Sequence, residues 1–136
     1  MEREEIDNVW ESVYYTPDMK TRVKDMAPKF IEFLMTLLLM EDEINIGQFK
    51  DENGSYGTMV TYDIYDSDKI LQVRYKNDTS FDLHIAVEND EGVTESFYHT
   101  LTEKEIEIIP EGLQILMKKA FNSGDELVWR PGAIDQ

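Results

Sequence analysis

The chain has 136 residues, and 13 Lys and Arg stand against 29 Asp and Glu, which gives a formal net charge of -16 at pH 7. This length is typical of a single domain over 1-136 that buries about two-thirds of the surface its unfolded chain exposes. A hydrophobic share of 41% excludes a disordered acidic tail, and the absence of cysteine excludes disulfides, thiolate metal sites and a cysteine nucleophile. The charge also argues against direct binding to nucleic acid or to an anionic membrane.

The first block, 4-43, has apolar residues at helical spacing, beginning with Ile6, Val9, Trp10 and Val13. Thr16 and the Pro that follows it predict the start of a second helix, and Pro28 predicts a break within it. Residues 30-40 are apolar around nearly the whole circumference, so we expect the central core helix, wrapped by the sheet. The alternative is that the outer side of this helix is an interface with a partner or with a second copy, which would make a homodimer.

Between 45 and 101 the apolar period changes from 3.6 to 2, and turn residues recur at 52-55, 66-68, 77-79 and 89-92. This pattern predicts an antiparallel meander of four to five strands with one face buried. The expected register places Arg74 opposite Asp82 on the outer face, as a cross-strand ion pair.

The last block predicts a C-terminal helix pair over 102-122. Thr102 and Glu105 form a capping box, Pro110 divides the two helices, and Gly124 ends the second. The tail, 123-136, stays ambiguous, because 127-129 could add an edge strand that Pro131 would stop. The expected fold class is therefore α+β: N-terminal helices, a meander packed on a central apolar helix, and a C-terminal helix pair.

Acidic residues cluster in the expected turns. Because alternate turns of a meander lie at the same end of the sheet, six carboxylates should gather there, with a charge density similar to that of a DNA strand. They are Asp63, Asp66, Asp68, Glu88, Asp90 and Glu91. The alternative is that these residues only form turns and keep the chain soluble. On the outer face of the sheet, Met59, Tyr65 and Tyr98 could dock a partner, or the face could be covered by a helix.

No motif predicts catalysis. His84 and His99 are the only histidines, and their spacing suits neither a metal site nor a base pair. The sequence has no nucleophile elbow, phosphate loop or dinucleotide fingerprint. The Asp51-Asn53-Ser55 spacing imitates the start of a calcium loop, but Tyr56 stands where glycine is needed. We therefore expect no catalytic residue, no metal and no cofactor.

The start of the chain lacks the features of a secretory signal, and the run over 30-40 is too short to cross a bilayer, so we expect a soluble, cytoplasmic protein. The favoured function is an acidic interaction module that inhibits or masks a basic partner, such as a nuclease or another nucleic-acid enzyme. Phages and mobile elements use inhibitors of this kind, and a DNA mimic is one form. The alternative is an immunity or chaperone-like protein that neutralises one specific basic partner, and the third hypothesis is a small-ligand protein or an enzyme.

Overall fold

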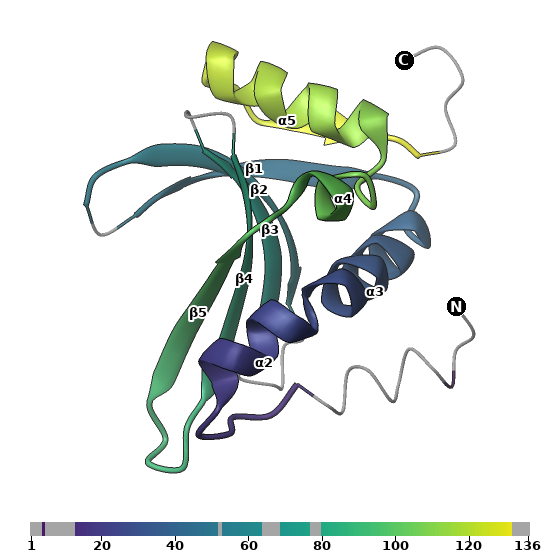
Figure 1. Cartoon of the computed structure of the whole chain (residues 1–136). Helices are drawn as coiled ribbons and strands as arrows, with labels where there is room; N and C mark the ends of the chain where they lie inside the picture. The colour runs from purple at the N-terminus through teal and green to yellow at the C-terminus, as the bar shows by residue number, and fades with distance from the viewer. Residues whose placement is uncertain (1–3, 5–12, 52, 64–68, 77–79, 132–136) are drawn as a thin grey trace.

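A computed structural model of the chain describes residue 4 and residues 13-51, 53-63, 69-76 and 80-131 (Figure 1). Of the first block the structure describes Glu4, which is helical, and two complete helices, α2 (Met19–Asp25) and α3 (Ala27–Leu39). The predicted helical residues Ile6, Val9 and Trp10 lie outside the described residues. Pro28 lies in the first turn of α3, so the break predicted there is confirmed. The predicted helix start at Thr16 is wrong, because Asp18 is the N-cap of α2 and the Thr16 hydroxyl bonds its carboxylate at 2.6 Å.

One antiparallel sheet of six strands forms the centre of the protein, in the order β5-β4-β3-β2-β1-β6. The first five strands are a continuous meander, as predicted. Their bounds are β1 (Ile44–Lys50), β2 (Tyr56–Asp63), β3 (Ile70–Lys76), β4 (Phe81–Glu88) and β5 (Thr94–Thr100). The sixth strand, β6 (Leu127–Trp129), lies outside the predicted meander and pairs with β1 at the edge of the sheet, which is the edge-strand alternative left open for 127-129.

The register places the alternating apolar residues of the central strands on one face. Val60 pairs with Val73, and Val73 pairs with Leu83, and all three side chains are fully buried. Arg74 pairs with Asp82 on the opposite face, as the predicted register requires. The period-2 pattern therefore predicts correctly which side of the sheet faces the core.

Two further helices follow the meander, α4 (Glu103–Ile106) and α5 (Glu111–Ser123). The capping box of Thr102 and Glu105 is confirmed, and Gly124 ends α5 with a φ of 75°. The buried Thr58 hydroxyl of β2 donates to the Met117 carbonyl of α5 at 2.9 Å, which fixes α5 to the sheet.

All four described helices lie on one face of the sheet (Figure 1). The side of α3 toward the sheet is buried, with Phe30, Ile31 and Leu34 almost inaccessible, so this helix belongs to the core. Its C-terminal end is not enclosed, because Leu39 and Met40 are exposed. We call the other side of the sheet the helix-free face, because no described helix covers it. None of the described helices has the length and hydropathy to span a membrane.

Candidate functional site

The predicted acidic cluster is described only in part. Glu88 ends β4, and Asp90 and Glu91 are exposed in the β4-β5 turn. This turn is built by Asn89, whose side-chain oxygen accepts the backbone N–H groups of Glu91 and Val93, and by Gly92 with a φ of 78°. Tyr65, Asp66, Asp68 and the Asp63 side chain lie outside the described residues.

The backbone places the ends of β2 and β4 at the same end of the sheet. Asp63 pairs with Ile70 at the start of β3, and Ile70 pairs with Ala86 near the end of β4. The β4-β5 turn follows directly, beside α2 (Figure 1). We use the name acidic end for the described carboxylates around this turn, which are Asp18, Glu88, Asp90, Glu91 and Glu95.

A groove of about 580 Å³ opens at the acidic end, between the start of α2 and β5. Its walls include the carboxylates of Asp18 and Glu95 and the rings of Tyr15 and Phe97, whose centroids are 6.4 Å apart. Lys20 is the one cation that lines it among the described residues. Carboxylates beside aromatic rings suit an arginine or lysine side chain, which offers both a charge and an apolar stem.

The pKa of the Tyr15 hydroxyl reflects the negative potential of this groove. The charge of Glu95 is the largest effect and raises the pKa of Tyr15. Partial burial and a hydrogen bond to Glu95 raise it further, as do the charges of Asp90 and Glu91. Three carboxylates therefore act on one point, and they disfavour a further negative charge there.

Sequence reasoning missed the part of this site that comes from the segment leading into α2. Tyr15 and Asp18 are far from Glu95 in sequence, and the strand-turn pattern alone gave no reason to bring them together. The unusual placement of Glu95 was the available signal, because it occupies an inward-facing position of β5 beside Phe97. A carboxylate at such a position needs a polar opening, and the groove provides it.

The helix-free face carries the other two predicted docking residues. Met59 is half-buried and lies near the side-chain amide of Gln72, with a nitrogen-sulfur distance of 3.3 Å. Tyr98 is 52% exposed and stacks on His84, with ring centroids 4.5 Å apart. Tyr98 is therefore accessible to a partner, whereas Met59 takes part in the packing of this face.

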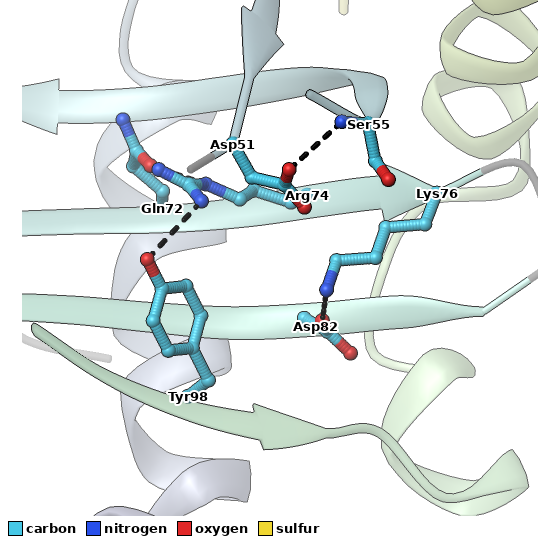
Figure 2. A network of polar contacts seen from close by, with 7 residues as sticks. All are labelled: Asp51, Ser55, Gln72, Arg74, Lys76, Asp82 and Tyr98. Atoms are coloured by element: carbon cyan, nitrogen blue, oxygen red, sulfur yellow. Dashed lines mark hydrogen bonds and ion pairs between the residues drawn. The ribbon is translucent and has the colours of Figure 1, made fainter. Parts of the chain in front are cut away.

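Arg74 is held in one position on the helix-free face (Figure 2). Its guanidinium lies over the rings of Phe49 at 4.4 Å and Tyr98 at 5.4 Å. Its Nε donates to the Gln72 side-chain oxygen at 2.9 Å, and Nη1 lies 3.4 Å from the Tyr98 hydroxyl. Gly57 gives the Phe49 ring its room, because a Cβ at this position would overlap that ring.

The same network sets the protonation of His84. The Gln72 side-chain oxygen accepts from Arg74, which can only donate, and lies 2.7 Å from Nδ1 of His84. Nδ1 therefore carries the proton, and Nε2 keeps a free lone pair. Burial, together with the nearby Arg74 charge, lowers the pKa of His84 to about 4, so the ring is neutral at pH 7.

The predicted ion pair between Arg74 and Asp82 is wrong, although their register is right. Lys76 reaches across to the Asp82 carboxylate at 2.9 Å (Figure 2), while Arg74 turns toward Gln72. Asp82 is only 4% exposed, and its second oxygen has no partner among the described residues. Nε2 of His84 is likewise buried without a described partner.

The other candidate sites have structural roles. Asp51 caps the β1-β2 turn by accepting the backbone N–H groups of Asn53 and Ser55, which uses one oxygen of the carboxylate expected in a calcium loop. His99 contacts Glu105 at 2.9 Å, beside the capping box. Burial raises the pKa of Glu105, but the bonds from Thr102 and His99 outweigh it, so the pKa is lowered overall.

The part of the chain that the structure describes contains no group of three or more His, Asp or Glu able to hold a metal ion. Comparison with known proteins gives no further assignment: no family model matches the chain, and no curated protein or solved structure matches it significantly.

Proposed function

We propose that the chain is an acidic interaction module that binds a basic protein through the acidic end and masks or inhibits it. The observation that carries this proposal is the groove between α2 and β5, where Asp18 and Glu95 flank two aromatic rings beside the exposed carboxylates of the β4-β5 turn. The carboxylates of the turn face solvent and can attract a basic partner from a distance, while the groove can hold one of the partner's side chains in direct contact.

The two parts of the site would act in sequence. A net charge of -16 attracts a basic surface, and electrostatic steering raises association rates by about 10 to 1,000-fold. An arginine or lysine of the partner would then enter the groove, with its stem along Tyr15 and its charge near Glu95. Steering sets the rate of association, and the desolvated contact sets the residence time.

A nucleic-acid enzyme is the partner class that we favour, because its substrate channel is basic and the acidic end can occupy it in place of phosphates. The second candidate is an immunity or chaperone-like role toward one specific basic protein. The shape of the groove favours this second role, because a hollow of about 580 Å³ with two rings selects by fit as well as by charge.

Charge reversal tests the proposal. The double variant Asp90→Lys, Glu91→Lys changes the net charge by +4 in the β4-β5 turn. The matched control, Asp125→Lys, Glu126→Lys, makes the same change in the exposed segment after α5, far from the acidic end (Figure 1). Each protein is immobilised and exposed to a nuclease-treated lysate of the source organism, and of its host if the source is a phage, and retained proteins are identified by mass spectrometry.

A basic protein retained by the wild type and the control, but lost from the acidic-end variant, is the expected result. Retention by all three proteins would refute a role for the acidic end, and so would the absence of any specific capture. Competition by DNA and steep loss with salt would identify a mimic. Salt-resistant capture of one protein would identify the immunity or chaperone-like role.

A further inference from the structure

The helix-free face contains a second hollow, of about 470 Å³, on the other side of β5 from the groove. Arg74 and Lys76 of the central strand β3 line it, and the tip of the β1-β2 hairpin lines it through Asp51 and Asn53. Hydroxyl groups of β5 complete the wall, from Thr94, Ser96 and Tyr98. Every described residue of its lining has a polar side chain, and two cations of a strongly acidic chain lie together there.

The fold fixes the position of the Arg74 guanidinium but leaves most of its N–H donors available for a ligand. Two rings and Gln72 fix the guanidinium, so little side-chain freedom remains to be lost on binding. Only two of its five N–H donors are used by described residues, and the contact with Tyr98 is long at 3.4 Å. The remaining donors lie on Nη1 and Nη2, and a planar pair of such donors matches the two oxygens of a carboxylate.

Three polar side chains near Arg74 and Lys76 are buried at a cost in stability that a purely structural role does not explain. Gln72, Asp82 and His84 are each more than nine-tenths buried on a face that apolar residues could fill. Asp82 and His84 each keep one buried polar atom without a described partner. Buried polar atoms without a partner reduce stability, and functional sites are where folded proteins accept such a cost.

We propose that this hollow binds a small polar carboxylate, held by the guanidinium of Arg74 and by the hydroxyl groups of β5. A carboxylate fits better than a phosphate for electrostatic reasons. Lys76 pairs with Asp82, and the Asp51 carboxylate accepts two backbone N–H groups of its own turn. The Arg74 guanidinium is thus the one cation of the lining with no carboxylate partner among the described residues. A monoanion is neutralised there, whereas a dianion would face repulsion from a chain of net charge -16.

The polar lining also defines the rest of the ligand. The hydroxyls of Thr94 and Ser96 and the amide of Asn53 offer both donors and acceptors, which suits hydroxyl groups rather than a hydrocarbon tail. Sugar acids and hydroxy acids have this composition, and a volume of about 470 Å³ accommodates either.

Glucuronate is the probe, and a two-dimensional NMR titration of the full-length protein is the assay. Inorganic phosphate serves as the competing anion. We expect glucuronate to shift the Arg74 Nε–H resonance and the backbone amides of Ser96 and Tyr98 in a saturable way. Arg74→Lys keeps the charge but loses the planar fork, and it should weaken binding by at least about tenfold. Tyr98→Phe is a milder variant that keeps the ring stacked on His84 and should weaken binding less than Arg74→Lys.

Lys119→Gln is the control, because this exposed lysine lies on α5 and lies outside the hollow. It removes one positive charge and should leave glucuronate binding unchanged. Equal binding to wild-type and Arg74→Lys protein would overturn the proposal, as would the absence of shifts in the wild type. Tighter binding of phosphate than of glucuronate at the same resonances would overturn the assignment to a carboxylate.

Discussion

His84 makes the stability of this protein sensitive to mild acid. The native ring is neutral, with a pKa of about 4, whereas an unfolded histidine titrates near 6.5. Between these two values the unfolded chain binds a proton that the folded chain does not, so the free energy of unfolding falls as the pH is lowered. The stabilisation is fully present above pH 6.5 and is lost progressively toward pH 4.

The size of this effect follows from the same two pKa values. At pH 5 the linkage amounts to about 2 kcal/mol, and screening by solvent reduces it to between about 1 and 2 kcal/mol. The lowered pKa of Glu105 also contributes to acid sensitivity, but only below the usual range of a glutamate, near pH 4.5. The interval from pH 7 to pH 5 therefore excludes the effect of Glu105.

Urea unfolding followed by circular dichroism at pH 7, 6 and 5 measures this effect. His84→Phe is the comparison, because phenylalanine keeps a flat ring against Tyr98 but cannot bind a proton. The wild type should lose about 1 to 2 kcal/mol more than the variant between pH 7 and pH 5. Equal losses, or a His84 pKa near 6.5 in an NMR titration of the folded protein, would refute the reasoning.

Two other substitutions test the packing. Gly57→Ala should destabilise the fold by about 1 to 3 kcal/mol, because the added Cβ would clash with the Tyr75 carbonyl oxygen and the Phe49 ring; unchanged thermal unfolding would contradict this. Leu34→Ala should cost about 2 to 5 kcal/mol in chemical unfolding, since Leu34 is fully buried. Leu39→Ala is its control, with a much smaller cost expected at a side chain that is 48% exposed.

Local signals in the sequence predicted the fold best. The capping box of Thr102 and Glu105 involves residues three apart in sequence, so its formation depends little on the tertiary structure. The register between Arg74 and Asp82 follows from a short loop and from period-2 alternation. β6 was harder to predict, because a strand of three residues has little pattern of its own and forms through its pairing with β1.

The side-chain partners and the groove could not be predicted from the sequence, for a physical reason. Lys76 is long enough to reach Asp82 from a diagonal position, so the residue directly opposite in the register is not the one that pairs. The groove exists because α2 packs beside β5, and that contact depends on how the apolar side of the helices meets the sheet. Periodicity identifies such a side but does not say which strand it covers.

The two proposed sites share one edge strand and use its opposite faces. In β5, the side chains of Glu95 and Phe97 face the groove at the acidic end, while Thr94 and Tyr98 line the hollow beside Arg74, and Ser96 borders both. Because side chains alternate along a strand, a few residues can serve two ligands of opposite charge without their charged groups meeting. Reversal of charge in the β4-β5 turn should therefore abolish capture of a basic partner while leaving glucuronate binding in place. Arg74→Lys should do the reverse, so loss of one interaction does not entail loss of the other.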